Sequence, residues 1–168
     1  YDPLATGPFS AFGFSGANIN LDPTRRQGLE LDAGHRLSPS LAINAHAAFR
    51  RTEFRSGAYA GRDVPLVPRS TLAVRADWTP LPGQRLSGGV NWVSSQYVDL
   101  DNSCSVPRHA TADLRYALQL RQAEFSLGVS NLFDRRYFTQ AFACDAGQAT
   151  SLYPEQGRAF TAAVRLSF

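Results

Sequence analysis

The sequence has no lysine, only two cysteines and no long apolar run. All 17 basic residues are arginines, spread along the chain, whereas nucleic-acid binding favours a clustered basic face, so we expect no nucleic-acid partner. No apolar run approaches the roughly 18 residues of a transmembrane helix. Cys104 and Cys144 are too far apart for a zinc site or a redox CxxC motif. The first residues from Tyr1 resemble no signal peptide, so a secreted chain would need an upstream start.

Motifs for catalysis are also absent. There is no glycine-rich phosphate loop, no GxSxG elbow and no kinase signature. The three histidines show no HxxxH or close carboxylate spacing; we expect His46 on an inward face, His35 near a short turn and His109 at the opposite rim. The sequence therefore predicts a protein that is not an enzyme and has no catalytic residue, protein metal site or cofactor.

The end of the chain shows a clear alternation. Apolar residues occupy every second position, and Thr, Ala, Arg and Ser lie between them: Phe160, Ala162, Val164, Leu166, Phe168. Period-2 alternation gives a β-strand one apolar and one polar face. About ten such residues cross a bilayer as a tilted strand.

The same alternation occurs in six earlier segments, around 29–33, 41–50, 72–78, 86–92, 110–120 and 124–130. Together they predict an all-β, antiparallel sheet of seven strands, each about 10 to 14 residues long, against a usual 5 or 6. The predicted connections alternate: short ones near 37–40, 80–83 and 121–122, and long ones over 55–68, 98–107, 134–157 and before Thr24.

Short turns at one rim and long loops at the other are typical of bacterial outer-membrane barrels. Aromatic residues near the predicted strand ends suit the girdles of such barrels: Trp78, Trp92, Tyr97, Phe133, Tyr137 and Phe138. A soluble β protein with these aromatics in its core is the alternative. A complete single-chain bacterial barrel has an even number of strands, so seven strands predict part of a barrel.

Several segments carry a family resemblance. Asn131-Leu132-Phe133-Asp134, with Tyr137, resembles the NLFD-x-x-Y segment of TonB-dependent outer-membrane receptors. Gly157-Arg158-x-Phe160, after Pro154, resembles their P-x-x-G-R-x-F strand opening. Segment 18–30, with Gly28 and Glu30, and segment 67–69 are similar to two of their strand starts. The strand ending on Phe168 resembles the signal that the barrel-assembly machinery reads.

The resemblance implies a barrel of about 22 strands filled by a plug. Residues 1–168 would be its carboxy-terminal third, without the plug domain. It implies import of a scarce nutrient, most often a ferric siderophore, with energy from a TonB complex that grips the plug. Outer-membrane lipid and lipopolysaccharide would surround it. A small non-transporting barrel with a structural or adhesive role, and a soluble β-rich binding module, are the alternatives.

The family's orientation puts the carboxy-terminus in the periplasm, the long loops outside and Tyr1 at the outer rim. Cys104 and Cys144 then lie in neighbouring external loops, where we hypothesise a disulfide; two free thiols, or a partner cysteine upstream, are the alternatives.

Asn131 and Asp134 are interpreted as turn formers that end a strand. Gly28 suits close packing or a bulge, and the charges on the predicted inward face are expected to pair with each other or with a plug: Glu30, Asp32, Arg75, Asp77, Asp113, Arg115 and Arg165. Aromatic and arginine residues on external loops suit anionic chelates, and they equally suit ordinary anchoring of the loops, so none is singled out as substrate-binding. The predicted long loops carry Tyr59, Arg62, Tyr97, Asp99, Asp101, Arg108, Tyr137, Phe142 and Tyr153.

Overall fold

The computed structural model describes residues 21–167. The strands among them are β1 (Thr24–Ser38), β2 (Leu41–Phe54), β3 (Ser70–Trp78), β4 (Gln84–Val93), β5 (Gln96–Tyr97), β6 (Ser105–Val106), β7 (His109–Leu120), β8 (Ala123–Ser130), β9 (Phe138–Asp145), β10 (Gln148–Pro154) and β11 (Ala159–Leu166). None of the described residues forms a helix that could cross a membrane. Three sequence-based expectations lie outside this range: the position of Tyr1, the Asn18–Asn20 part of a strand motif, and the terminal Phe168.

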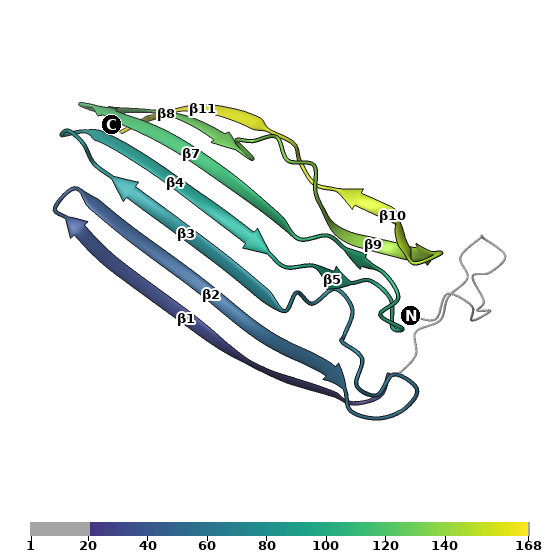
Figure 1. Cartoon of the computed structure of the whole chain (residues 1–168). Coiled ribbons are helices and arrows are strands. Elements are labelled where there is room, and N and C mark those ends of the chain that lie inside the picture. The colour runs from purple at the N-terminus through teal and green to yellow at the C-terminus, as the bar shows by residue number, and fades with distance from the viewer. Residues whose placement is uncertain (1–20, 168) are drawn as a thin grey trace.

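Seven strands form one antiparallel sheet in the order β1-β2-β3-β4-β7-β8-β11 (Figure 1). They are the seven alternating segments of the sequence, so the predicted all-β, antiparallel fold is confirmed. The predicted length range was wrong at both ends: β1 has 15 residues, whereas β8 and β11 have 8 each. β1 is longer because its pairing with β2 continues past the apolar segment, from Leu29 opposite Phe49 to Thr24 opposite Phe54.

The connections divide between two rims. The turn rim holds the tight β1–β2, β3–β4 and β7–β8 turns, and the loop rim holds the long connections 55–69, 94–108 and 131–158 (Figure 1). Gly83 in the β3–β4 turn has a φ of 76°, and a Cβ there would lie 2.7 Å from the Gln119 carbonyl oxygen, so only glycine fits without a shift. The short turns agree with the sequence-based prediction.

Two of the long connections contain strands that the sequence analysis did not predict. β5 and β6 form one hairpin, and β9 and β10 form another. β5 and β6 are too short to show a period, and alternation in β9 and β10 is interrupted by Ser151, whose φ is 51°, and by a register shift at Pro154.

Strand register gives the main sheet one apolar face. Leu29 lies opposite Phe49, and Val74 lies opposite Val90, so apolar side chains neighbour one another from strand to strand. Many of them are open to their surroundings; Leu127 is 62% exposed and Phe160 is 76% exposed. A soluble sandwich would bury such a face under a second sheet, whereas both small hairpins lie at the loop rim (Figure 1).

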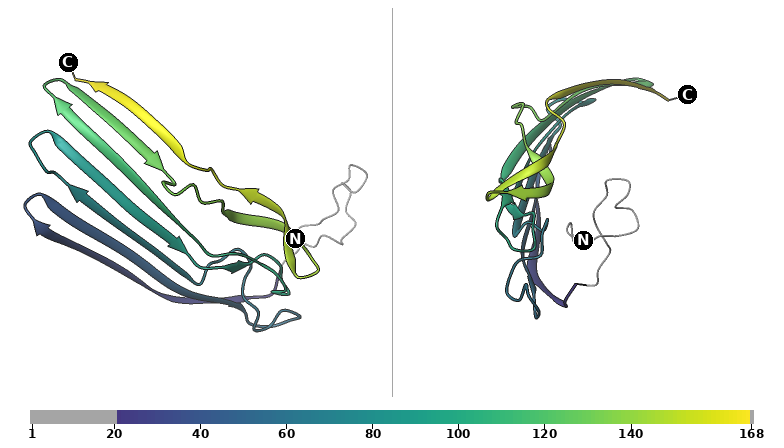
Figure 2. Two further views of the ribbon diagram at one scale, coloured as in Figure 1. Left: turned by 45° about the horizontal axis from the view of Figure 1, so that its top comes forward. Right: turned by 90° about the vertical axis from the view of Figure 1, so that its right-hand side faces the viewer.

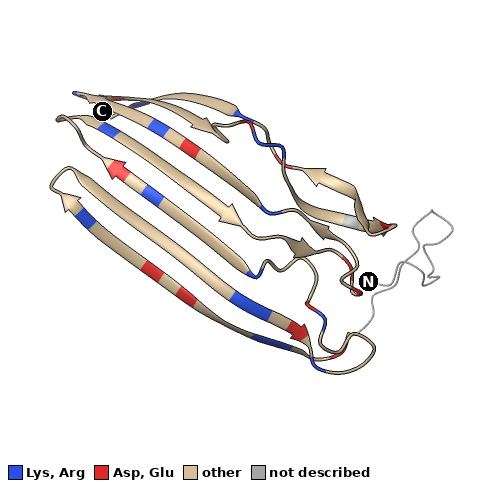
Figure 3. Ribbon diagram, in the orientation of Figure 1, with Lys and Arg blue, Asp and Glu red and all other residues tan. Residues whose placement is uncertain are grey.

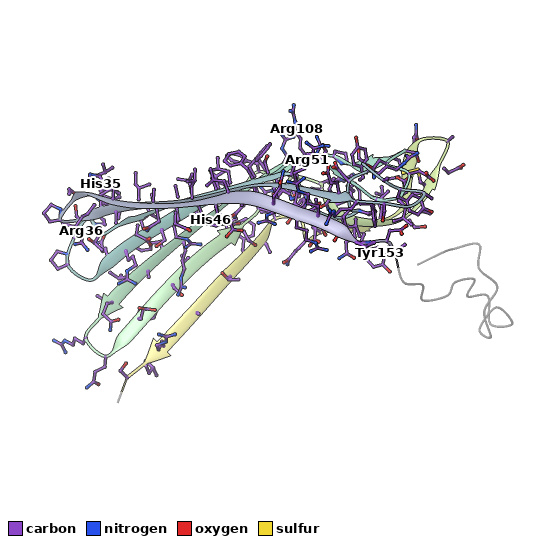
Figure 4. The ribbon with its side chains drawn as sticks, turned by 90° about the horizontal axis from the view of Figure 1, so that it is seen from below. His35, Arg36, His46, Arg51, Arg108 and Tyr153 are labelled. Carbon is purple, nitrogen blue, oxygen red and sulfur yellow. A yellow bond between two sulfur atoms is a disulfide. The ribbon has the colours of Figure 1, made fainter. Side chains whose placement is uncertain are left out.

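The sheet is strongly curved (Figure 2). His35, in register with the apolar set of β1, lies on the convex side, and His46 lies on the concave side (Figure 4). The apolar face is therefore the convex face, and the alternate, polar positions line the concave face. This is the arrangement of a barrel wall whose outside is apolar and whose inside is polar.

The β1–β2 register depends on two local features. A register shift between Arg36 and Ser38 places even-numbered residues of β1 opposite even-numbered residues of β2, which keeps each face uniform. A Cβ on Gly28 would lie 2.5 Å from the Phe49 carbonyl oxygen, so glycine here permits close approach of the β2 backbone.

A charge should be tolerated on the concave face and not on the convex one. Val90 and Asn91 are exposed neighbours in β4 on opposite faces. In lipid vesicles, Val90→Arg should lower the free energy of unfolding by about 2 kcal/mol, because the guanidinium would enter hydrocarbon. Asn91→Arg, the matched control, should change it by less than about 0.5 kcal/mol. Urea titration followed by tryptophan fluorescence measures both, and equal losses would contradict the assignment of the faces.

Candidate functional site

The concave face carries charges of both signs along β1, β3 and β7 (Figure 3). His46 Nδ1 lies 2.7 Å from Asp32 Oδ1, and Arg50 Nη2 lies 3.8 Å from Glu30 Oε1. Asp77 accepts a hydrogen bond from the Ser87 hydroxyl at 2.6 Å. These contacts join neighbouring strands, so much of the charge on this face is paired within the sheet.

The His46–Asp32 pair was missed by the sequence analysis, which found no close histidine–carboxylate spacing. The two residues are 14 positions apart and meet only through the β1–β2 register. The signal available in the sequence was the alternation of polar and apolar residues, which puts the even-numbered residues of both strands on the same face. With Asn44, Arg75 and Asn91, the pair lines a shallow hollow in the concave face.

The loop rim holds most of the buried side chains among the described residues. The most buried apolar residues there are Phe54, Cys104, Val106 and Ala141, and Asp63 and Asn131 are buried with them. The main sheet buries little, because both of its faces are open. The loop rim is therefore the part of the described chain with a packed interior; we call the connections 55–69, 94–108 and 131–158 the loop cluster.

The first two connections of the loop cluster are joined by an amide–backbone pair. Asn102 Oδ1 accepts a hydrogen bond from the Asp63 amide at 2.7 Å, and Asn102 Nδ2 donates one to the Asp63 carbonyl at 3.0 Å. Arg69 Nε donates to the Asp63 carboxylate at 2.8 Å, which satisfies this buried acid. Arg62 contacts both the backbone and the side chain of Asp101.

The second and third connections are joined by the cysteines. Cys104, next to β6, and Cys144, in β9, lie side by side with a Cα–Cα distance of 6.1 Å, which is within the usual range for a disulfide. Gln96 in β5 donates a hydrogen bond to the Thr139 carbonyl in β9 at 2.6 Å. The two hairpins therefore form one packed body at the loop rim (Figure 1).

Asp99 holds the turn that precedes Cys104. Its carboxylate accepts hydrogen bonds from the Ser103 amide, the Ser103 hydroxyl and the Cys104 amide, at 2.9, 2.9 and 3.1 Å. Partial burial acts to raise the pKa of Asp99, but these hydrogen bonds outweigh it and hold the pKa below its ordinary value. The Asp99 oxygen and the two sulfurs lie within 4.8 Å of one another. Because three donors engage the carboxylate, Asp99 acts as an anchor of this loop.

The residues of the NLFD-type motif connect the end of β8 to the start of β11. The Asn131 side chain accepts from the Arg135 amide at 2.9 Å and donates to its carbonyl at 2.8 Å. Asp134 Oδ1 accepts from the Arg158 amide at 2.9 Å, and a Cβ on Gly157 would lie 3.1 Å from the same oxygen. The Leu132 amide donates to the Ala112 carbonyl in β7, which extends the β7–β8 pairing past Ser130, whereas Phe133 is 72% exposed. These contacts order the backbone and leave no free polar group on Asn131 for a ligand.

The loop residues that suit anionic chelates do not gather in one place. Tyr59 packs against Phe54, and Tyr137 stacks on His109 with ring centroids 4.5 Å apart. Partial burial, then the negative charges of Glu155 and Asp113, raise the pKa of Tyr137. Arg108 points to the convex side and Tyr153 to the concave side (Figure 4). The Phe142 side chain lies outside the described part of the structure.

Comparisons with known proteins agree on one family. Residues 1–132 match the family model described as "TonB dependent receptor-like, beta-barrel". The ferrichrome outer membrane transporter/phage receptor of Escherichia coli is 30% identical over 143 residues, which cover 79% of this chain and 18% of that protein. The pesticin receptor of Yersinia pestis is 32% identical over 121 residues, 68% of this chain and 18% of the receptor.

Solved structures show the same fold. The ferric yersiniabactin uptake receptor of Yersinia pestis superposes with a TM-score of 0.77 and 28% identity, over 86% of this chain and 24% of the receptor. The siderophore receptor PiuA of Acinetobacter baumannii gives a TM-score of 0.73 at 23% identity. The chain thus spans about a fifth of the length of the curated relatives that it matches.

The hypothesis of a disulfide gives a direct prediction. Peptide mapping of the mature protein under non-reducing conditions should find Cys104 and Cys144 linked to each other, because the fold brings their Cα atoms to 6.1 Å. Cys104→Ser should lower the stability of the loop cluster by about 2–4 kcal/mol. Free thiols, or either cysteine linked to a third, would contradict the hypothesis.

Acid should loosen the loop cluster through Asp99. Folding lowers the pKa of Asp99, so its ionised carboxylate stabilises the folded loops. This stabilisation is complete above the unfolded pKa of about 3.9, and it is lost as the pH falls through the lower pKa of the folded state. Amide hydrogen exchange in residues 98–107 should therefore accelerate, beyond its intrinsic pH dependence, only below about pH 4. Asp99→Asn should remove this extra pH dependence; if the variant keeps it, another group is responsible.

Proposed function

This chain belongs to the TonB-dependent receptor-like β-barrel family, and we propose that it forms part of the barrel wall of an outer-membrane receptor that imports a ferric siderophore with energy transmitted through TonB. The family consists of outer-membrane receptors and transporters rather than enzymes. The observation that carries the proposal is the family match over residues 1–132. It agrees with the structure, in which the sheet has the apolar convex face and the polar concave face of a barrel wall. Relatives named for ferrichrome, ferrioxamine and ferric yersiniabactin support a siderophore as cargo.

Further strands would complete the barrel wall, and a plug would fill the barrel. Among residues 21–167, β1 and β11 each pair with one strand only, so each has an edge open for another strand. The chain covers 18% of the ferrichrome transporter's length, which leaves room for a plug and the rest of a barrel in the whole protein. The carboxy-terminal portion of the barrel is our proposed place for this chain.

The proposed orientation puts the loop rim outside the cell and the turn rim in the periplasm. In bacterial barrels the short turns face the periplasm and the long loops face the exterior. The loop cluster would then meet the siderophore, and the cysteine pair would lie in an oxidising environment. β11 would offer Phe160, Val164 and Leu166 on its convex side to the barrel-assembly machinery; all three are well exposed.

The concave face is proposed to contact the plug. Its pairs, such as Asp32–His46, are exposed side chains joined across strands. Such pairs contribute little to stability in water but present a patterned polar surface. A plug with complementary polar groups would match this surface, and the nutrient would pass between plug and wall.

Iron uptake tests this function. The complete protein would be produced in a strain without its own siderophore receptors, and uptake of radioactive iron measured from ferric hydroxamate, catecholate and carboxylate siderophores. We expect saturable uptake of at least one complex, lost in a strain without TonB. The double variant Cys104→Ser/Cys144→Ser should raise KM more than it lowers the maximal rate, because the loops are no longer preorganised.

The matched control for the loop variant is Arg85→Ala at the turn rim, which should leave both parameters unchanged. Uptake that is absent for every complex, or that continues without TonB, would contradict the proposed function.

A further inference from the structure

One pair of adjacent arginines lies outside the main sheet. The sequence has three Arg-Arg pairs, at 25–26, 50–51 and 135–136. The first two lie in β1 and β2, within the stretch where these strands pair with each other. Arg135 and Arg136 lie in the connection between β8 and β9, at the loop rim. Both are exposed, and neither side chain makes an ion pair or a hydrogen bond with another described residue, so two free guanidinium groups stand side by side on the loop cluster.

Exposed arginines in a connection between strands have the chemistry of a protease target. Exposed loops are the preferred sites of proteolytic nicking, and trypsin-like proteases select their substrate through a pocket for the side chain before the cleaved bond. An extended peptide is held on another protein by main-chain hydrogen bonds, as an added strand is. Cleavage therefore requires that the backbone groups next to the arginine side chain are free as well.

The backbone of Arg135 is not free. Its amide donates a hydrogen bond to Asn131 Oδ1 at 2.9 Å, and its carbonyl accepts one from Asn131 Nδ2 at 2.8 Å. The same Nδ2 donates to the Gln156 carbonyl at 3.2 Å. Asn131 is only 4% exposed, so water competes little for these bonds. One buried side-chain amide thus occupies both backbone groups of Arg135.

Asp134 bends the chain just before the two arginines. Its φ is 52°, a left-handed conformation that an extended peptide does not have. Its amide donates to the Asn131 carbonyl at 2.8 Å, and its Oδ1 accepts from the Arg158 amide at 2.9 Å. The turn is therefore tied to the segment that leads into β11, and it has to open before the arginines can enter an extended binding site.

We propose that the peptide bond between Arg135 and Arg136 is a cleavage site for trypsin-like proteases, and that the side chains of Asn131 and Asp134 form a latch that keeps it closed. Cleavage is a hydrolysis: the hydroxyl of water joins the Arg135 carbonyl carbon and the remaining hydrogen joins the Arg136 nitrogen as the peptide bond breaks. Access for proteases outside the cell rests on the proposed function, because that function puts the loop rim outside. The latch itself does not depend on it.

Limited proteolysis of the complete protein in detergent tests the latch. The test variant is Asn131→Gly, and the matched control is Asn102→Gly. The two asparagines have φ values of 48° and 54°, which glycine adopts without strain. Each also holds a loop through a pair of hydrogen bonds between its side-chain amide and one backbone residue.

Trypsin would be added for a short time, and mass spectrometry would quantify the chain end created after Arg135. The samples would be reduced first, so that a disulfide between Cys104 and Cys144 does not hold the two fragments together.

Asn131→Gly should be cut at this bond about 25-fold faster than the unchanged protein, at roughly fivefold for each of the two hydrogen bonds that Arg135 loses. Asn102→Gly should stay within about twofold of the unchanged protein at the same bond, because it loosens a different part of the loop cluster. If Asn131→Gly fails to fold, Asp134→Gly, which removes one hydrogen bond of the latch, should give an acceleration of about fivefold.

Three results would overturn the latch. They are no acceleration in Asn131→Gly, equal acceleration in Asn102→Gly, and an acceleration that is as large after Arg62, in another loop, as after Arg135.

Trypsin added to intact cells separates this proposal from the proposed function. The Asn131→Gly protein should be cut after Arg135 from outside the cell. Cleavage only after the cells are opened would contradict the proposed orientation, and the latch would stand. Failure of the latch in detergent, with iron uptake by the unchanged protein intact, would overturn the latch and leave the receptor function standing.

Discussion

Strand register is the constraint on which the rest of this molecule depends. Because side chains alternate with a period of two, a slip of one residue between β1 and β2 would move Glu30 and Asp32 beside apolar side chains. The register shift between Arg36 and Ser38 prevents this, and the tight β3–β4 and β7–β8 turns limit slippage in their hairpins. With register set, one face of the sheet is apolar across all seven main strands and the other is polar.

The two faces and the two rims then take different roles. The convex face has little to bury it within the chain, so it needs an apolar medium, whereas the concave face pairs its charges from strand to strand. Packing within the described chain is concentrated at the loop rim, where Asp63, Asn102 and the Cys104–Cys144 pair join three connections. A wall with a packed cluster at one rim suits the proposed receptor, which would hold a bulky ligand above a membrane-spanning barrel.

Period and turn length were enough to predict the seven main strands, their pairing and the two rims. The hairpins in the long connections could not be predicted, because β5 and β6 have two residues each and Ser151 interrupts the alternation of β10. The His46–Asp32 pair was missed since it exists only through register. Cys104 and Cys144 were placed in neighbouring loops, but the roles of Gln96 and Asn102 in joining those loops depend on tertiary contacts that no local pattern records.

Contact of the convex face with lipid is the central claim, and site-specific photo-crosslinking along β7 tests it most directly. A photoreactive residue would be placed at each position from 110 to 120 in the intact, membrane-embedded protein, and the lipid crosslinked at each position would be measured. We expect crosslinking to alternate, strong at Ala112, Leu114 and Leu118 and weak at Asp113 and Arg115. Crosslinking that is uniform along the strand, or stronger at the odd-numbered positions, would contradict the account.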